Sequence, residues 1–192
     1  MRQALQAPCR QLFNLIVAFE PRWGARSRVE RFLSSFTRYS IFGSSQYTLL
    51  LRLHGDPFKF VEENCKKFRN EPLLLRLIPV DAVCPPKINV FAKEACRVLN
   101  EKILESDKIA IKVEGGIIDV DMKRKLHKSE IIDAIITNCE RKYSIDLSNP
   151  TLIVLVRGVN VYRGSQRYVT ISVVRPSQIY SRYSSRLTCL SP

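Results

Sequence analysis

The stretch "NPTLIVLVRGVNVYRGSQRYVTISVVRP", residues 149–176, decides how the second half of this chain folds. Two apolar runs rich in β-branched residues, "TLIVLVRGV" and "YVTISVVRP", flank the polar segment "NVYRGSQR". Such runs are typical of buried strands, and Pro176 ends the second one because proline cannot donate a ladder hydrogen bond. The stretch therefore predicts a pair of strands joined as a hairpin.

The charge of this stretch has one sign only. It holds four arginines and no acid, and after Asp146 the chain contains no Asp or Glu at all. A merely solvated surface usually mixes its signs. The arginines of this acid-free region are Arg157, Arg163, Arg167, Arg175, Arg182 and Arg186. We interpret them as part of a surface for a polyanion.

Upstream of the hairpin, the pattern alternates between helix and strand. Apolar residues at helical spacing predict an amphipathic helix over 88–103, and "KIAIKVEG" (108–115) alternates like a half-buried strand. A second helix is predicted from Ser129 through "SEIIDAIITNCERKY", with a capping serine, acids in its first turn and bases in its last.

The first eighty residues predict a domain of their own. Strand-like and helix-like segments follow one another in the order βαββαβ, which is the ferredoxin-like arrangement. We expect strands near 12–20, 39–43, 47–55 and 73–81, and helices near 24–36 and 56–68. The predicted fold class is thus α/β (α+β), with this N-terminal ferredoxin-like domain followed by a second domain.

The paired prolines of "CPPKI" (84–88) suggest the domain border, since they cannot continue a strand. We expect an N-terminal domain over 1–83 and a second domain over 84–176. The remaining residues, 177–192, are rich in Ser, Tyr and Arg and predict a basic flexible tail.

Composition favours an anionic partner. The 192 residues include 31 Lys and Arg against 18 Asp and Glu, a net charge of +13. Such an excess suits nucleic acid or an anionic membrane surface. No apolar stretch approaches the ~20 residues of a membrane-spanning helix, so no insertion into a membrane is expected.

The N-terminus and the cysteines favour a cytoplasmic protein. The apolar "LFNLIVAF" (12–19) faintly resembles a secretory signal, but Glu20 and Pro21 follow it without a small-residue cleavage site. The six cysteines are scattered, with no C-x-x-C and only two histidines to complete a metal site. We therefore expect buried free thiols and no metal.

No motif of a familiar enzyme class is present. The chain lacks a phosphate-binding GK[ST] loop, a dinucleotide-binding glycine pattern, a G-x-S-x-G elbow and an H-E-x-x-H helix. Gly115 and Gly116 predict a tight turn, and Asp119 and Asp121 predict solvated surface. His127 lacks a nucleophile or acid partner nearby in sequence, so we expect no catalytic residue and no cofactor.

The basic loop "KRKLHK" (123–128) is the other candidate for polyanion binding. It precedes a predicted helix, whose free N–H groups and positive dipole end also attract phosphate. Arginine grips phosphate with a planar fork, and tyrosines can stack on unpaired bases, here Tyr162, Tyr168, Tyr180 and Tyr183. The candidate RNA contacts are Lys112, Lys123, Arg124, Lys125, His127, Lys128, Arg157, Arg163, Arg167 and Arg175.

These residues resemble a known family. "KIAIKVEG", "KLHKSEIIDAIITNCERKYSIDLSNPTLIVLVRGV" and "YVTISVVRP" are similar to a THUMP domain over 84–176, just under half of the chain. Thr151 stands where the family commonly has an acid. An N-terminal ferredoxin-like domain usually precedes this domain in tRNA-modifying enzymes, in agreement with the independent βαββαβ pattern.

The resemblance implies a function in tRNA modification. Family members bind tRNA, particularly the acceptor stem and its single-stranded 3′ end. A chain that ends soon after the THUMP strands resembles the stand-alone adaptor for cytidine acetylation, whose partner would be a separate RNA acetyltransferase. Two alternatives stay open: a small RNA-modifying enzyme with a site around His127, Asp119 and Asp121, and a component that binds or processes rRNA.

Overall fold

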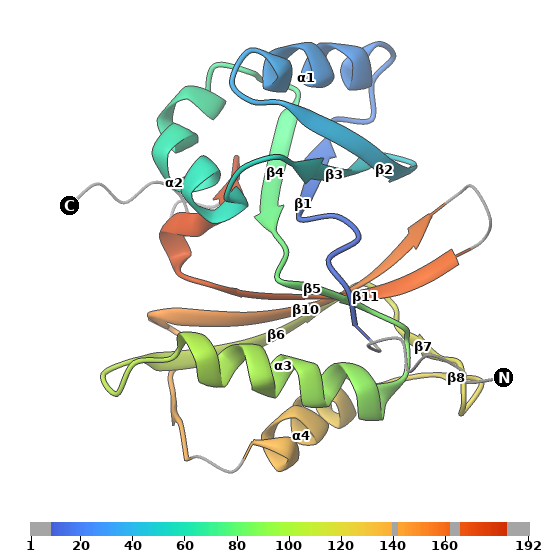
Figure 1. Ribbon diagram of the computed structural model, residues 1–192, viewed down its shortest axis with the longest axis vertical. Coiled ribbons are helices and arrows are strands. Elements are labelled where there is room, and N and C mark those ends of the chain that lie inside the picture. Colours follow the sequence, from blue (N-terminus) through green and yellow to red (C-terminus); the bar gives the residue numbers. More distant parts are fainter. Residues whose placement is uncertain (1–8, 140–141, 162–165, 184–192) are drawn as a thin grey trace, which may run out of the picture.

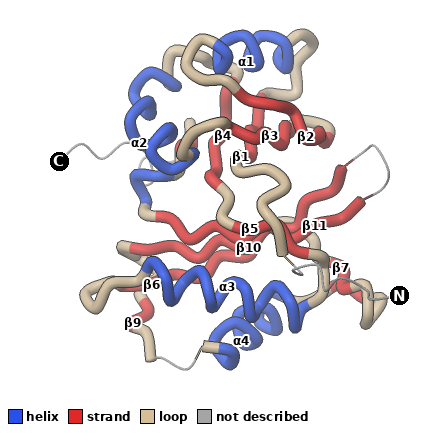
Figure 2. The backbone as a smooth tube through the Cα atoms, in the orientation of Figure 1, coloured by secondary structure: helices blue, strands red, loops and turns tan. Residues whose placement is uncertain are grey.

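Two β-sheets face each other in this chain, and a pair of helices covers the outer face of each. The computed structural model describes residues 9–139, 142–161 and 166–183. Figure 1 shows α1 above the upper sheet, α2 to its left, and α3 and α4 below the lower sheet. In Figure 2 the strands occupy the middle of the molecule and the helices its outside. The molecule therefore has four layers, helix, sheet, sheet and helix.

The N-terminal sheet confirms the predicted ferredoxin-like order. Its strands run antiparallel in the order β4-β1-β3-β2, with the short β12 added beside β4. The elements are β1 (Leu15–Phe19), α1 (Ala25–Ser34), β2 (Tyr39–Ser45), β3 (Thr48–Leu53), α2 (Pro57–Phe68), β4 (Leu74–Pro79) and β12 (Tyr180–Ser181). The helix α2 begins where expected, because the Asp56 carboxylate accepts the backbone N–H groups of Phe58 and Lys59.

The C-terminal sheet contains the predicted hairpin. Its order is β5-β11-β10-β6-β9, with β10 antiparallel to β11 and parallel to β6. The hairpin pairs Ile153 with Val174 at one end and Val161 with Gln166 at the other. The elements are β5 (Ala82–Cys84), α3 (Ile88–Lys102), β6 (Lys108–Glu114), β7 (Ile118–Asp119), β8 (Arg124–Lys125), α4 (Lys128–Asn138), β9 (Ser144–Ile145), β10 (Leu152–Val161) and β11 (Gln166–Val174).

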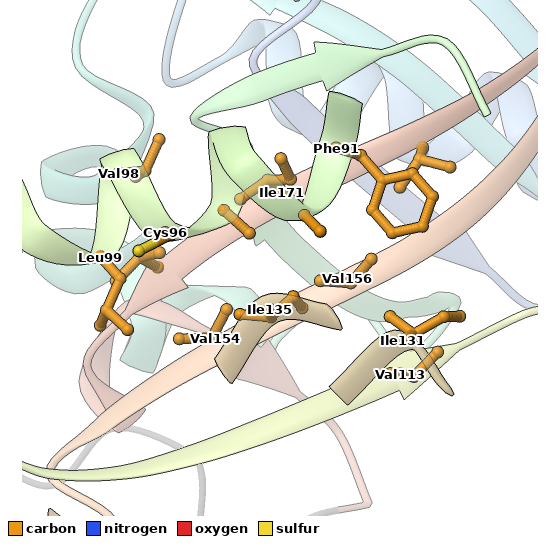
Figure 3. Close-up of a cluster of buried hydrophobic side chains, with 14 of the residues drawn as sticks. Phe91, Cys96, Val98, Leu99, Val113, Ile131, Ile135, Val154, Val156 and Ile171 are labelled. Atoms are coloured by element: carbon orange, nitrogen blue, oxygen red, sulfur yellow. The ribbon is translucent and has the colours of Figure 1, made fainter. Parts of the chain in front are cut away.

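Helices α3 and α4 bury one apolar face each against this sheet. Phe91 and Leu99 of α3 and Ile135 of α4 are wholly buried, together with Val154 and Val156 of β10 (Figure 3). Their spacing follows the 3.6-residue period of the helices and the two-residue period of the strand. None of the described helices combines the length and the apolarity that crossing a bilayer requires.

A third apolar cluster joins the two sheets. Phe13, Ile16 and Ile78 on the N-terminal side pack in one cluster with Ile153 and Leu155 on the C-terminal side, and all five are buried. The second sheet begins before the predicted border, since residues 82–84 already pair with β11. Because this buried apolar cluster contains residues of both sheets, we expect the two halves to behave as one body.

The predicted flexible tail is wrong for residues 177–183. A short 3-10 turn (Pro176–Gln178) leads into β12, which pairs with β4. Tyr180 is fully buried, and its hydroxyl donates a hydrogen bond to the Phe68 carbonyl at 3.2 Å. Its ring packs in the core of the N-terminal domain. The polar residues around it in sequence gave no sign of this burial. Residues 184–192 lie outside the described residues.

The prediction of free thiols is also wrong. Disulfides join Cys9 to Cys84 and Cys96 to Cys139, and the described residues include no free cysteine. The partners are far apart in sequence and meet only because Arg10 pairs with Val83 and because α3 packs on α4. Disulfides are rare in reducing compartments, so the predicted cytoplasmic location loses the support of the free thiols and stays a prediction.

Candidate nucleic-acid interface

The predicted basic loop emerges from the end of β6. A tight turn at Gly115 and Gly116 connects β6 to the small β7–β8 ribbon, as predicted. Gly115 has φ +71°, and a Cβ there would lie 2.8 Å from the Gly158 carbonyl oxygen. Only glycine accommodates both conditions without strain, so this turn directs the basic loop toward the end of the sheet where β10 also ends.

Asp119 anchors the loop, and the prediction that it belongs to a solvated surface is wrong. The residue is 1% exposed, and its carboxylate accepts backbone N–H groups of Ile88 at 2.8 Å and of Asp121 and Met122 at 2.9 Å. Burial opposes its ionisation, but these N–H groups and Lys87 together hold the pKa of Asp119 below its ordinary value. The negative charge is thus used to fold the loop against the start of α3.

Three lysines of the loop remain free of acids. Lys123, Lys125 and Lys128 are exposed, and within the described chain no carboxylate forms an ion pair with them. Lys123 has a left-handed backbone with φ 54°, at the tight turn between β7 and β8. These three ammonium groups give the loop a surplus of positive charge that no ion pair among the described residues neutralises.

Arg124 and His127 are tied to Glu130. The Arg124 guanidinium donates two hydrogen bonds to Glu130, at 2.6 and 3.0 Å, and the His127 backbone N–H donates a third at 2.7 Å. The Arg124 contact and the His127 N–H lower the pKa of Glu130 to about 2. Arg124 and His127, both predicted to contact RNA, therefore lie in the basic loop, and the Arg124 guanidinium forms an ion pair with Glu130.

Helix α4 differs at both ends from its predicted bounds. It begins at Lys128 with His127 at the N-cap, because Glu130 caps the His127 N–H, and Ser129 lies inside the first turn. It ends at Asn138, so its last turn contains no base, and Lys142 lies beyond it. Lys128 thus lies in the first turn of the helix, where its dipole also favours phosphate, whereas Lys123 and Lys125 lie before the helix in the turn and strand of the β7–β8 ribbon.

Arg167 lies at the same end of the sheet as the basic loop. Strands β6 and β10 are parallel, so the loop after β6 and the hairpin after β10 leave the sheet on the same side (Figure 1). Arg167 is exposed near the start of β11, opposite Asn160. Arg163 lies outside the described residues, so its predicted contact is not placed.

Arg157 and Lys112 lie on the face of the sheet that meets the N-terminal domain. The Arg157 guanidinium donates to Glu114 at 3.2 Å, and Arg76 of β4 donates to the same carboxylate oxygen at 2.8 Å. Burial and the nearby Arg76 lower the pKa of Arg157 despite Glu114. Lys112 is half-buried opposite Leu155 and forms no ion pair with a described residue.

Arg175 is at the far end of the sheet. It donates to both carboxylate oxygens of Asp107, at 2.9 and 3.3 Å, and Thr151 donates to Asp107 at 2.8 Å. Asp107 directly precedes β6, and the basic loop follows it, so Arg175 lies one strand length, about 20 Å, from that loop. Two arginines of the acid-free stretch, Arg157 and Arg175, are therefore paired with carboxylates from an earlier segment, Glu114 and Asp107.

The predicted tyrosine platforms are dispersed. Tyr180 is buried and cannot stack on a base, whereas Tyr183 is 75% exposed and donates to Glu20. Tyr168 is half-buried beside Phe42, with ring centroids 6.1 Å apart. Tyr162 lies outside the described residues.

Sequence reasoning missed the contribution of the N-terminal domain at this end. A cavity of about 400 Å³ lies between β2, the start of α1 and the hairpin. Its lining is Arg26, Ile41, Phe42, Gly43, Ser44, Val161 and Gln166. The sequence held one local sign of this surface, the adjacent apolar residues Ile41 and Phe42. Successive side chains of a strand point to opposite faces of the sheet, so only one of the two can enter the core beneath the helices.

The described residues do not assemble a cluster of metal ligands. No group of three or more His, Cys, Asp or Glu side chains that could hold a metal occurs within the described ranges. The oxygens of Asp119 are occupied by backbone N–H groups, and Asp121 pairs with Lys87 at 2.8 Å. The arrangement offers exposed cations and an aromatic cavity, which suit binding of a polyanion.

Comparisons with known proteins give similarity of fold. No protein-family model matches the chain, and no curated protein matches its sequence. Among solved structures, SMU.472, a putative methyltransferase complexed with SAH, shares 11% identity with a TM-score of 0.50, over 83% of this chain and 41% of that one. The α+β class of the fold is thus shared with a solved structure.

Two further solved structures are similar at lower scores. PH1313 from Pyrococcus horikoshii Ot3 is 14% identical with a TM-score of 0.48, over 84% of this chain and 54% of that one. A 4-thiouridine synthetase in complex with RNA and bound ATP is 13% identical with a TM-score of 0.45, over 84% and 41%. The chain spans about half or less of the length of each of these three structures.

Proposed function

We propose that this chain is a non-catalytic RNA-binding adaptor with a THUMP domain over 84–176. It binds tRNA at the acceptor stem and the unpaired 3′ end and presents it to a separate enzyme, an acetyltransferase acting on cytidine. The observation that carries the proposal is the placement of Lys123, Lys125 and Lys128, exposed and without an acid partner in the described chain, at the same end of the sheet as Arg167.

The THUMP assignment rests on order as well as motif. The resemblance predicted a strand, a basic loop, a helix, a turn and two paired strands, and the structure contains β6, the loop, α4, the 146–151 turn, β10 and β11 in that order. Asp146 closes the turn by accepting the N–H groups of Ser148 and Asn149. The local hydrogen bonds thus agree with the quoted "SIDLSNP" motif.

An adaptor suits this surface better than an enzyme. The alternative catalytic group was His127, Asp119 and Asp121, and its most buried member, Asp119, is saturated by three N–H groups. A general base needs a free oxygen or nitrogen within reach of its substrate. Exposed lysines and arginines can bind phosphate without such a base, because phosphate contacts depend on charge and exposure.

Salt-dependent binding tests this proposal. If about six phosphates are contacted through single-stranded segments, the log–log slope of tRNA affinity against salt should be near −4. Replacing Lys123 and Lys125 by Ala should make that slope shallower by about 1–2 and weaken binding. The matched control replaces two exposed lysines of α2, Lys59 and Lys66, which lie in the other domain.

The control variant should bind like the wild type. A salt slope near zero for the wild type, or equal losses in the two double variants, would show that the loop does not contact RNA. The binding measurement uses fluorescence anisotropy of labelled tRNA at several salt concentrations, with the same tRNA in every series.

A further inference from the structure

The cavity beside β2 lies where the two domains meet at the hairpin end. Its volume of about 400 Å³ falls in the lower part of the ~300–1,000 Å³ range of small-ligand pockets. The N-terminal domain supplies Arg26 and the strand segment from Ile41 to Ser44, and the hairpin supplies Val161 and Gln166. Gly43 lets the two domains approach, since a Cβ at this position would lie 2.8 Å from Val161 Cγ1.

Phe42 forms a fixed aromatic wall of this cavity. Its ring centroid lies 5.4 Å from that of Phe13, which is fully buried, and 6.1 Å from that of Tyr168, which meets it edge-on. Phe42 itself remains 38% exposed. Two neighbouring rings thus hold the orientation of an aromatic side chain while part of it stays open to a ligand.

Two polar side chains at the cavity, Gln166 and Arg26, have hydrogen-bond donors that no other described group uses. The Tyr168 hydroxyl donates to Gln166 Oε1 at 2.6 Å, so the amide nitrogen of Gln166 is left as the donor. Arg26 uses Nε to reach Glu30 at 2.7 Å, and its terminal nitrogens bond no other group in the described chain. A planar, polar-edged ligand with an attached anion would use both donors.

We propose that this cavity binds one unpaired nucleobase of the RNA, stacked on Phe42. Gln166 and Ser44 hydrogen-bond the edge of the base, and the guanidinium of Arg26 contacts an adjacent phosphate. Aromatic side chains commonly hold unpaired bases in this way. The inference rests on the proposed RNA-binding function, since the basic loop brings the RNA to this end of the molecule.

An added peptide strand fits this edge less well than a base. Strand β2 is the outer strand of its sheet, but its register with β3 shifts between Ile41 and Gly43. Such a bulge interrupts the regular row of backbone groups that a peptide would need for pairing. The net charge of +13 also favours a ligand with phosphates.

Two matched RNA probes test the pocket. One is a hairpin RNA with a single-stranded adenosine tail, and the other has the same sugar–phosphate backbone with abasic sites in the tail. The wild type should bind the adenosine tail roughly ten-fold more tightly than the abasic tail, the effect of one base–aromatic stack. Phe42→Ala should lose this preference, and Phe42→Trp should keep it.

Controls separate this inference from the proposed function. Leu147→Ala changes an exposed apolar residue outside the cavity and should keep the ten-fold preference. Lys125→Ala should weaken both probes equally. Photo-crosslinking with 5-bromouridine in the tail should map to the peptide that contains Phe42.

Each result has one meaning. Tight, salt-dependent binding of both probes with no base preference, or a preference that survives in Phe42→Ala, would overturn the pocket and leave the RNA-binding function standing. Failure of both probes to bind would overturn the proposed RNA-binding function itself.

The melting temperature of Phe42→Ala is measured in parallel to show whether this variant folds. If the alanine variant does not fold, the base preference of wild type and the crosslink to the Phe42 peptide decide between pocket and no pocket.

Discussion

At the residue scale, identical side chains have different roles according to what they contact. Arg167 is exposed on the hairpin, whereas Arg175 holds the carboxylate of Asp107, which is 5% exposed. Arg157 shares Glu114 with Arg76 at the junction of the domains. One-signed charge in a sequence thus marks both candidate RNA contacts and the basic halves of internal ion pairs.

This difference predicts opposite effects of two arginine substitutions. Arg167→Ala should weaken tRNA binding by about 1–3 kcal/mol and leave the melting temperature within a few degrees of wild type. Arg175→Ala should instead destabilise the fold by about 1–3 kcal/mol, since it leaves the buried Asp107 with fewer partners. Anisotropy titration and urea unfolding measure the two effects, and a loss of stability in Arg167→Ala would contradict the assignment.

Asp119 gives a second residue-scale prediction. Because its folded-state pKa is lowered, its contribution to stability is complete above the ordinary pKa of about 3.9 and is lost as the pH falls through the lower folded value. Asp119→Asn should cost about 2 kcal/mol at pH 7, since an amide NH₂ cannot accept backbone N–H groups. The difference from wild type should shrink below about pH 4.

The matched control for this prediction is Asp133→Asn, on the exposed face of α4. It should unfold like the wild type at every pH. Urea unfolding followed by circular dichroism between acidic and neutral pH measures all three proteins. A difference between Asp119→Asn and wild type that stays constant down to the lowest pH would contradict the role of the carboxylate.

At the element scale, the β10–β11 hairpin is the framework of the C-terminal domain. Ile153 of β10 is 1% exposed and packs between the two sheets, whereas Asn160 of the same strand is exposed. Ile153→Asp should therefore unfold the domain, because it buries a charge without a partner. Asn160→Asp should leave the fold intact. Far-ultraviolet circular dichroism and thermal melting measure whether each variant is folded. A folded Ile153→Asp variant would contradict the observed packing.

The elements themselves were largely predictable from sequence. The βαββαβ order, the helix over 88–102 and the hairpin were confirmed because each follows from a local period and local turn residues. The end of α4 was not, since the charged segment after Asn138 keeps a helical composition although the helix ends there. The start of α4 also differs from the predicted one, because the Glu130 carboxylate accepts the N–H of His127 and makes His127 the N-cap.

At the scale of the whole molecule, the proposed adaptor role predicts dependence on a partner enzyme. The purified chain, given tRNA and an acetyl donor, should modify nothing until an RNA acetyltransferase is added. Addition of the chain should then raise acetylated cytidine, and Lys123→Ala combined with Lys125→Ala should reduce the gain. Mass spectrometry of digested tRNA measures the product. Turnover by this chain alone, lost in His127→Ala, would establish the enzyme alternative instead.

The sequence by itself determined the main helices and strands, their order and the surplus of positive charge, because periodicity, turn residues and composition are local properties of the chain. Only the tertiary structure decided which cations stay free, which cysteines pair and where Tyr180 lies. Glu114 reaches Arg157 across 43 positions, Asp107 reaches Arg175 across 68, and Tyr180 reaches Phe68 across 112. Such contacts depend on how the sheets are ordered and stacked, and no local pattern encodes the side chain that will stand opposite a given residue.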